Sequence, residues 1–406
     1  MKIRKFKEFN SIGIEEINAA KKVVKTGILS GFIANDGKEF YGGKYVKKLE
    51  NAFKKYFKCK FAISVNSWTS GLVCAVGALN IKPGDEIIVS PWTMSATATA
   101  IIAWGGIPIF SEIDLDNYCL DPKFLKNKIN KKTKAIMVTD IFGQSADYKN
   151  INKIAKKYNL KVISDTAQSI GSKQSKKYSG TLCDIGGFSL NRHKHIHCGE
   201  GGVVITNDKY LAEKIFKIRN HGEVINKDKK FKNLIGYNLR LNEVESAIAL
   251  EQLKKLKRII DKKIKMAELL SKKLSKLKGL KTPKINKDYT NVYYSYPMKI
   301  NDKITIASKK KIFDMLKKEG VPINDNYVNL LKYKLYQNKN IYSEYPWTYT
   351  KQRKLYDRNS NVYKQIELLN KKIHLDIAFC KYDFNEDDIV FISNAFYKVW
   401  KKLKLI

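Results

Sequence analysis

The chain lacks the features of a membrane protein and of a disulfide-stabilised protein. Its 406 residues contain no apolar run near the length of about 18 residues that a membrane helix needs. The first residues, MKIRKFKEFNSIG, are basic, but no apolar stretch follows them, so we expect no signal peptide. The six cysteines form no C-x-x-C pair, which favours reduced thiols over a disulfide framework or a zinc ribbon. We therefore expect a soluble, cytoplasmic protein.

Acidic residues and arginine are scarce beside lysine. Lys and Arg together number 77 against 39 Asp and Glu, which gives a formal net charge of +38, and only seven of the basic residues are arginine. Nucleic-acid readers that bind bases or phosphates through two parallel hydrogen bonds rely on arginine. The lysines are spread over the whole chain, so we expect no nucleic-acid partner. A lysine-rich solvent face explains the charge, and a preference for anionic small molecules stays open.

Short apolar runs predict a parallel sheet in the first half of the chain. Helical segments rich in lysine and asparagine, such as residues 152–159, lie between the first four of these runs. Strand, helix, strand at this spacing is typical of a parallel sheet covered by helices on both faces. The predicted strands span residues 86–91, 107–114, 134–143, 160–168, 186–190 and 201–208.

A long helix divides this region from the rest of the chain. Asn242 and Glu245 form a capping pair at its start, and apolar residues recur at helical spacing as far as about Gly279. A strand at 291–300 and a lysine-rich α+β region follow. We place a domain boundary inside the helix, which gives an α/β domain of residues 1–260 and a smaller C-terminal α+β domain of residues 261–406.

Two stretches have residues suited to binding a ligand: one resembles an anion site, and the other lies at the sheet edge where ligands bind. In residues 65–80 a turn of small residues opens into a helix. Thr69 and Ser70 stand where free backbone N–H groups and a hydroxyl can bind an anion, although an ordinary Ser/Thr cap would have the same pattern. Trp92 follows the strand at 86–91, at the edge where α/β proteins place their ligands, although a core position would look the same.

Asp165 ends a predicted apolar strand, so its carboxylate lies at the sheet edge beside a hydrophobic interior. Burying a carboxylate without a partner is costly, and the position therefore predicts a cation close to it, unless Asp165 simply caps a helix. Gln168, three residues further on, lies on the same side of any turn that forms there.

The stretch NRHKHIHCGEGG, residues 191–202, places three histidines at alternate positions around Lys194. His193, His195 and His197 could share one face of an extended strand and resemble a set of metal ligands. The chain before the Gly-Glu-Gly-Gly turn should be irregular, however, and only one glutamate lies nearby, so we expect no metal site. Contact with a substrate phosphate or a donor carboxylate, and local packing, remain as roles for the histidines.

The order and spacing of these features resemble the DegT/StrS-type sugar aminotransferases, which are pyridoxal-phosphate enzymes of fold type I. The resemblance covers almost the whole chain and weakens after about residue 300. It implies a mostly parallel central sheet with helices on both faces, plus a smaller C-terminal α+β domain. The supporting segments are ILSGF (28–32), KPGDEIIVSPWT (82–93), FGQSAD (142–147) and GYNLRLNEVESAIALEQL (236–253).

The resemblance assigns the central chemistry to Lys194 and Asp165. Lys194 falls at the position of the family's Schiff-base lysine, whose free amine then serves as the base that moves a proton. Asp165 matches the partner of the pyridine nitrogen, Trp92 the residue that stacks on the ring, and Gln168 the neighbour of the ring's 3-hydroxyl.

The same resemblance implies how the cofactor phosphate is held. Ser189, five residues before the lysine, matches the hydroxyl that binds the phosphate together with Thr69 and Ser70. Asn238 matches the asparagine that reaches the phosphate from the other subunit. The resemblance therefore implies a homodimer with shared active sites.

The activity implied by the resemblance is transfer of an amino group from an amino acid, L-glutamate in the family, to a keto sugar. Nucleotide-linked keto-deoxysugars for cell-surface polysaccharides are the commonest acceptors, and a small phosphorylated ketone or a cyclitol would fit the same residues. Two other interpretations are a sugar 3-dehydratase, from a related class with histidine in place of the lysine, and a non-catalytic regulator. Lys194 disfavours the first, and the complete set of cofactor positions disfavours the second.

Three positions depart from the pattern of many relatives. Asp140 replaces a histidine and Trp68 replaces a glycine, and both changes leave the cofactor residues intact. Asn-Asp-Asn-Tyr at 324–327 stands where the family often has His-Tyr near the substrate, and the tyrosine-rich segment 327–363 shows little periodicity. These two stretches leave the identity of the acceptor open.

Overall fold

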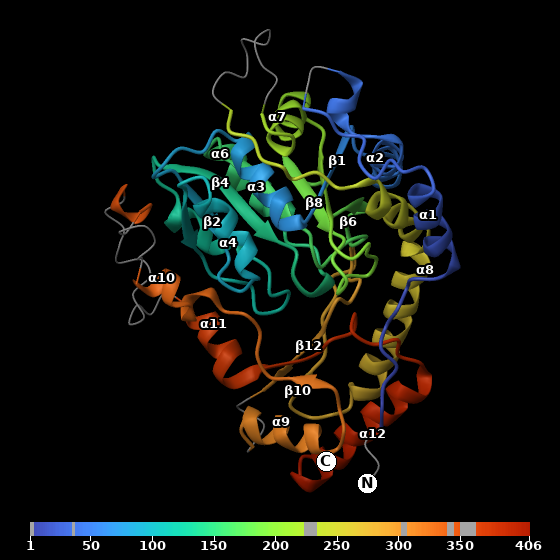
Figure 1. Cartoon of the computed structure of the whole chain (residues 1–406). Coiled ribbons are helices and arrows are strands. Elements are labelled where there is room, and N and C mark those ends of the chain that lie inside the picture. Colours follow the sequence, from blue (N-terminus) through green and yellow to red (C-terminus); the bar gives the residue numbers. More distant parts are fainter. Residues whose placement is uncertain (1–3, 35–36, 223–233, 302–306, 339–344, 350–362) are drawn as a thin grey trace.

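The computed structural model describes residues 4–34, 37–222, 234–301, 307–338, 345–349 and 363–406. It has a larger unit around one sheet and a smaller unit around a second sheet, and the long helix α8 (Glu243–Leu274) runs along one side of both (Figure 1). No helix within these ranges is both long enough and apolar enough to cross a lipid bilayer.

Seven strands form the sheet of the larger unit: β1 (Phe61–Val65), β2 (Glu86–Val89), β3 (Ile107–Phe110), β4 (Thr133–Thr139), β5 (Lys161–Asp165), β8 (Ile185–Ser189) and β9 (Gly202–Thr206). Their order is β1-β9-β8-β5-β4-β2-β3. Each neighbouring pair from β8 to β3 is parallel, whereas β9 runs antiparallel to both β8 and β1. The prediction of a mostly parallel sheet is confirmed, and β1 is a strand that the sequence did not predict.

Helices cover both faces of this sheet, as predicted. α3 (Trp68–Ala78) and α4 (Ser95–Ile102) pack into one apolar cluster, whereas α2 (Lys44–Phe57) and α8 pack into another. Val204 belongs to the first cluster and its neighbours on β9 belong to the second, so the two clusters lie on opposite faces. The other helices of this unit are α1 (Ile14–Val24), α5 (Pro122–Leu125), α6 (Tyr148–Lys157) and α7 (Lys209–Arg219).

Helix α8 begins as the sequence predicts and ends earlier. The Asn242 side chain accepts a hydrogen bond from the backbone N–H of Glu245 at 2.9 Å, which caps the first turn. The helix was expected to reach about Gly279 but ends at Leu274. The chain turns there because Leu277 and Leu280 are both buried in the core of the smaller unit.

Four antiparallel strands form the sheet of the smaller unit, in the order β10-β12-β14-β13. The strand predicted at 291–300 begins five residues late, at Tyr296. The strands are β10 (Leu280–Lys281), β12 (Tyr296–Ile300), β13 (Ile323–Asn324) and β14 (His374–Ile377), and the helices are α9 (Lys309–Lys318) and α12 (Glu386–Lys402). A separate small sheet joins β6 (Lys173–Gln174), β7 (Lys177–Tyr178) and β11 (Tyr289–Thr290).

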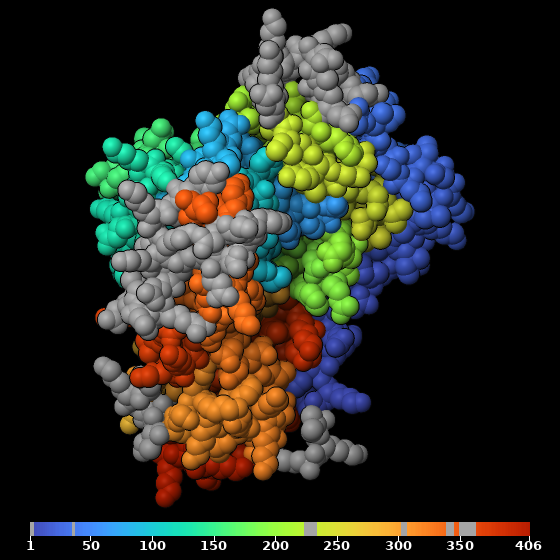
Figure 2. Space-filling model, turned by 60° about the vertical axis from the view of Figure 1, so that its left-hand side comes forward, coloured from blue at the N-terminus to red at the C-terminus, as the bar shows by residue number. Residues whose placement is uncertain are grey.

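Both ends of the chain cross between the two units. The N-terminal segment runs along α8 to the smaller unit, where Phe6 packs against Phe384 and the N–H of Phe9 donates to Lys381 O at 2.9 Å (Figure 1). A segment from the second half of the chain packs against the larger unit, because Leu330 and Trp347 belong to its apolar cluster. Figure 2 shows orange atoms of this segment beside the larger unit. The short helices α10 (Lys334–Asn338) and α11 (Lys364–Leu368) lie in this region.

Candidate active site at the carboxyl end of the large sheet

Asp165 stands at the end of β5, as its sequence position predicts. Its side chain is buried, with 4% of its surface exposed. The indole Nε1–H of Trp68 donates to Oδ1 at 2.7 Å, and the hydroxyl of Thr97 donates to Oδ2 at 2.6 Å. Two neutral donors therefore fix both carboxylate oxygens. Within the described part of the chain, no cationic side chain forms an ion pair with Asp165, although the Lys194 ammonium is close enough to interact with its charge.

Lys194 lies in the loop between β8 and β9. Backbone hydrogen bonds close this loop at its base, from Cys198 N to Leu190 O and from Arg192 N to Gly199 O, both at 3.0 Å. Gly199 has a φ of +95°, a conformation that favours glycine and lets the chain turn back. The loop therefore presents Lys194 from a closed, defined turn.

The amine of Lys194 faces a largely desolvated environment. Burial lowers its pKa from the ordinary lysine value, and the negative charge of Asp165 opposes that shift. The ammonium also lies 4.6 Å from the centre of the Tyr294 ring. Lys194 and Asp165 come from different elements, yet they are close enough to interact electrostatically, which is what the sequence prediction requires.

The start of α3 and the end of β8 meet beside Gly202. Gly202 pairs with Ser189 across β8 and β9, and a side chain on Gly202 would fall 2.8 Å from Cα of Trp68 in the first turn of α3. Ser189 is buried at the end of its strand, whereas Thr69 is exposed at the helix N-terminus. The structure therefore brings together the three residues predicted to bind phosphate, Thr69, Ser70 and Ser189.

The hydroxyls at this helix start already have partners. Ser67 is the N-cap, and its side chain accepts a hydrogen bond from the N–H of Ser70 at 3.1 Å. The hydroxyl of Ser70 donates to Asn66 Oδ1 at 2.6 Å. The first N–H groups of a helix have no acceptor within the helix and can bind an anion, and Thr69 lies in this first turn. The site has the backbone donors of an anion-binding helix terminus.

Gln168 and Trp92 both contact Tyr327. The backbone N–H of Phe142 donates to Oε1 of Gln168 at 3.0 Å, and Nε2 of Gln168 donates to the Tyr327 hydroxyl at 2.7 Å. Trp92 has no exposed surface, and its ring centre lies 5.7 Å from that of Tyr327 and 5.4 Å from that of His374. Tyr327 therefore lies between the two residues predicted to contact the cofactor ring.

Asn238 is exposed and does not join the other predicted residues within this chain. Its side-chain oxygen accepts a hydrogen bond from Arg240 Nε at 2.8 Å. The neighbouring Leu239 accepts a backbone hydrogen bond from Asn66 at 2.9 Å, so Asn238 lies at the surface beside the start of α3. A side chain in this position can reach a second subunit.

The three histidines of the loop have three different environments. His195 is buried, its Nε2 lies 2.7 Å from Val292 O, and burial together with the charge of Lys263 lowers its pKa to about 3. His193 is exposed, and burial lowers the pKa of His197. In the part of the chain that the structure describes, no cluster of three or more His, Cys, Asp or Glu side chains is placed to hold a metal ion. Of the three histidines, only His195 is packed fully into the interior, where it contacts Val292.

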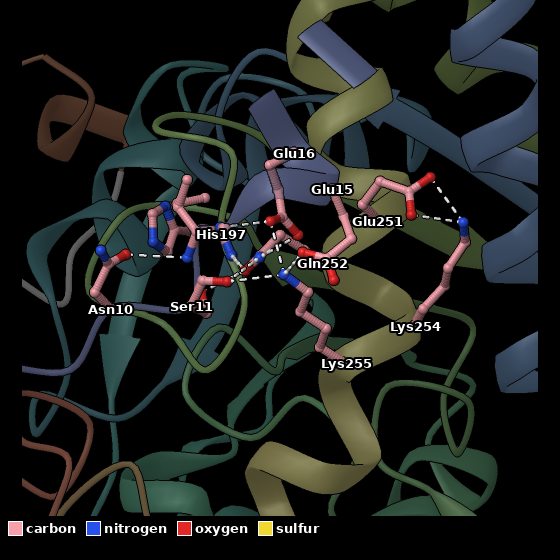
Figure 3. A network of polar contacts seen from close by, with 11 residues as sticks. Asn10, Ser11, Glu15, Glu16, His197, Glu251, Gln252, Lys254 and Lys255 are labelled. Atoms are coloured by element: carbon pink, nitrogen blue, oxygen red, sulfur yellow. Dashed lines mark hydrogen bonds and ion pairs between the residues drawn. The ribbon is translucent and has the colours of Figure 1, made fainter. Parts of the chain in front are cut away.

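A network of polar contacts ties this loop to α1 and α8 (Figure 3). Gln252, fully buried on α8, accepts hydrogen bonds from the His197 backbone N–H at 3.3 Å and from the Ser11 hydroxyl at 2.5 Å. Its amide donates to Glu16 at 2.8 Å, and Glu16 forms an ion pair with Lys255 at 2.7 Å. The loop that carries Lys194 is thus anchored to two helices.

Four residues of the site were not assigned to it from the sequence: Thr97, Tyr294, His374 and Cys380. Tyr327 and Trp68 were noted only as departures from the family pattern. Nothing in the sequence around His374 or Cys380 distinguishes them from core residues of a strand end. Their proximity to the site depends on the packing of β14 against the larger unit, which is a long-range contact.

Comparisons with known proteins agree with this arrangement. The model of the DegT/DnrJ/EryC1/StrS aminotransferase family matches residues 32–357. GDP-perosamine synthase of Vibrio cholerae is 33% identical over 276 residues, which cover 68% of this chain and 72% of that protein. The 3-oxo-glucose-6-phosphate:glutamate aminotransferase of Bacillus subtilis is 31% identical over 278 residues, which cover 67% and 62%.

A solved structure extends the similarity to the whole fold. The Helicobacter pylori aminotransferase involved in the biosynthesis of pseudoaminic acid has a TM-score of 0.80 and 26% identity to this chain. The match covers 98% of this chain and 100% of that one. The fold that the two proteins share therefore includes the smaller C-terminal unit as well as the unit around the large sheet.

Proposed function

Because the chain belongs to the DegT/DnrJ/EryC1/StrS aminotransferase family, we propose that it transfers the amino group of L-glutamate to a keto sugar. The family predicted from the sequence is confirmed, and the enzyme is an aminotransferase that depends on pyridoxal phosphate. The observation that carries the proposal is the convergence of Lys194, Asp165 and the N-terminus of α3 at the carboxyl end of one parallel sheet.

The residues present fit pyridoxal phosphate. A buried carboxylate without a cationic partner suits the ring nitrogen, a lysine of lowered pKa suits the aldehyde, and a helix N-terminus beside a buried serine suits the phosphate. When bound, this cofactor supplies an aldehyde that takes up the amino group and a ring that withdraws electrons from the reacting carbon.

Lys194 has two tasks in the proposed reaction. It holds the cofactor through its ε-nitrogen until the amino donor displaces it. With the cofactor bound, the freed amine of Lys194 would act as the base that moves a proton between the α-carbon of the amino donor and C4′ of the cofactor. Burial lowers the pKa of Lys194, which makes the neutral amine available at a lower pH than in a solvated lysine.

The other residues hold and orient the cofactor. Asp165 keeps a proton on the ring nitrogen, and Gln168 contacts the 3-hydroxyl. Thr69, Ser70 and Ser189 hold the phosphate together with Asn238 of the partner subunit. We assign Trp92 to the wall that faces the ring. Trp92 is fully buried and packs beside Tyr327. It can therefore face the cofactor ring only if the Tyr327 side chain moves away.

For the acceptor we propose a nucleotide-linked keto-deoxysugar used in cell-surface polysaccharide biosynthesis. The name of the Vibrio cholerae relative and the formal net charge of +38 support an acceptor that carries phosphate. The Bacillus subtilis relative is named for a phosphorylated keto sugar, which supports a small phosphorylated ketone as the second candidate. Tyr327 lies beside Gln168, whereas much of the rest of the segment 327–363 lies outside the described residues.

A screen of keto sugar nucleotides and phosphorylated ketones against the glutamate-loaded enzyme separates these acceptors. Formation of an amino sugar is the expected product. Release of ammonia with loss of a hydroxyl group would instead identify a sugar 3-dehydratase.

An exposed apolar surface supports a homodimer. It consists of Ile28, Leu29, Ile33, Tyr41, Ile235 and Tyr237, which are 37% to 63% exposed. These residues lie on adjoining segments, because Asn220 Nδ2 donates to Ile33 O and the N–H of Tyr237 donates to Ile218 O. Asn238 follows directly in the chain, so a partner that covers this surface also receives Asn238.

The six cysteines are all unpaired, which supports the proposed location in the reducing cytoplasm.

Covalent mapping of the cofactor tests the central assignment. We expect borohydride reduction of the holoenzyme to fix the cofactor on the peptide that contains Lys194. Lys194→Ala should abolish transamination, because it removes both the covalent link and the base. Mass spectrometry of the digested protein and an assay of amino-sugar formation provide the two measurements. Attachment to another side chain, or wild-type turnover by Lys194→Ala, would contradict the proposal.

A further inference from the structure

Trp68 fills a space between α3 and β8 that only glycine neighbours permit. Its side chain is buried, and a Cβ atom on Gly187 would fall 2.1 Å from Cζ3 of its ring. A Cβ atom on Gly71 would fall 2.6 Å from Cε3. Glycines on both elements therefore make room for the Trp68 indole.

The same indole reaches the carboxylate that the proposed function assigns to the ring nitrogen. Its Nε1–H donates to Asp165 Oδ1 at 2.7 Å, a distance typical of a hydrogen bond to a charged group. The indole nitrogen can only donate, so this contact requires Oδ1 to be an acceptor.

Thr97, the second donor to Asp165, does not require its oxygen partner to be an acceptor. The hydroxyl of Thr97 lies 2.6 Å from Oδ2 but also 2.9 Å from the hydroxyl of Thr93. A hydroxyl rotates and both donates and accepts, so the Thr97 contact is compatible with either protonation state of the carboxylate. Trp68 is the fixed donor of the two, because its indole N–H cannot rotate and cannot accept.

We propose that Trp68 is a positioning residue that holds Oδ1 of Asp165 as an acceptor and aims the carboxylate at the pyridine nitrogen, which favours the shared proton on the ring. This inference rests on the proposed function. Trp68 is also the first residue of α3, whose N-terminus faces the phosphate. One residue thus links the two ends of the cofactor site, through its backbone at the phosphate end and through its side chain at the ring-nitrogen end.

Trp68→Phe tests this role because it keeps an aromatic ring in the space and removes the N–H. The pH titration of the bound cofactor's absorbance should move to higher pH, because a less protonated ring withdraws fewer electrons from the link to Lys194. The dissociation constant of the cofactor should rise about tenfold, the value of one hydrogen bond to a charged group. The maximal rate of the half-reaction with glutamate should fall more than the KM for glutamate changes.

Trp104→Phe provides a matched control. The indole of Trp104 packs against Gly77 on the same helix, and its N–H donates to Val73 O at 2.8 Å, away from Asp165. We expect this variant to lose some thermal stability and to keep the wild-type titration and cofactor affinity. An unchanged titration in Trp68→Phe, or an equal change in Trp104→Phe, would overturn the inference.

A double-mutant cycle with Asp165→Asn separates this inference from the proposed function. If Trp68 acts through Asp165, then Trp68→Phe should not weaken cofactor binding further once Asp165→Asn is present. A full additional loss in that background would show that Trp68 acts through packing alone. If Asp165→Asn itself left cofactor binding and turnover unchanged, the proposed function would fail instead.

Discussion

At the scale of single residues, burial assigns different chemistry to neighbouring side chains. Lys194 and His195 are adjacent in sequence, and burial lowers the pKa of both. His195 has a pKa of about 3, and as a neutral ring it donates its Nε2–H to Val292 O. Lys194 keeps a carboxylate in its surroundings, Asp165, which still favours its protonated form. The sequence places Lys194 among three histidines, and the family resemblance selects the lysine; the packing adds that Lys194 and His195 face different groups.

Asp140 gives a pH dependence that can be measured. It is buried and accepts hydrogen bonds from Tyr148, Ser164 and Thr166, but burial raises its pKa from 3.8 to about 6. The folded state therefore holds a proton more tightly than the unfolded state between these two values. The stabilisation is complete below about pH 4 and is lost as the pH rises through about 6.

Urea unfolding of the wild type at several pH values should show this loss. Asp140→Asn cannot ionise at this position, so its unfolding free energy should lack the decrease between about pH 4 and 6. A parallel decrease in both proteins would assign the effect to other groups.

At the scale of elements, the sequence identified the strands that carry the site, because five of them are continuous apolar runs buried on both faces. It did not identify β1, because this short strand pairs only with β9, more than a hundred residues later. The predicted phosphate residues converge through that pairing and through Gly202. The contribution of β14 and Tyr327 to the site depends on how the smaller unit packs against the larger one. A local sequence pattern cannot predict that long-range contact.

The anchor of the Lys194 loop on α8 predicts a linked effect on stability and binding. Gln252→Leu removes an acceptor and a donor that are fully buried, so the unfolding free energy should fall by about 2–3 kcal/mol. The affinity for the cofactor should fall as well, because the loop that holds Lys194 loses its contact with the helix. Chemical denaturation and cofactor titration measure these two effects.

Glu251→Gln is the control for this prediction. Glu251 is the neighbouring residue on α8 and pairs with Lys254, whose side chain is 64% exposed. Exposed pairs of this type contribute little, so the change should stay within about 0.5 kcal/mol. If both variants lost the same stability and neither lost cofactor affinity, the network would not position the loop.

At the scale of the whole molecule, the exposed apolar surface around Asn238 predicts an obligatory dimer. Ile33→Asp places a charge in that surface and should convert the protein to a monomer with little turnover, because the proposed site needs Asn238 of the partner subunit. Analytical ultracentrifugation and the transamination assay provide the measurements. Val390→Asp changes an exposed apolar residue of α12 and should remain dimeric and active.

Mixing two inactive proteins examines the shared site directly. A hybrid dimer of Lys194→Ala and Asn238→Ala subunits has one site with both residues intact, so activity should return when the subunits exchange. No recovery after verified exchange would mean that Asn238 acts within its own chain, and full activity of Asn238→Ala by itself would mean that Asn238 has no role in the reaction.

Each unit contains a segment from the other end of the chain, and this affects how the protein unfolds and how it can be divided into fragments. Phe6 is held in the C-terminal core, and Trp347 is held in the core around the large sheet, so each unit is completed by a segment from the other end of the polypeptide. Neither half can be expressed alone without leaving an apolar gap in its interior. A cut in the middle of α8 should yield no autonomous fragment, and the two units should melt in a single transition even though each has its own sheet.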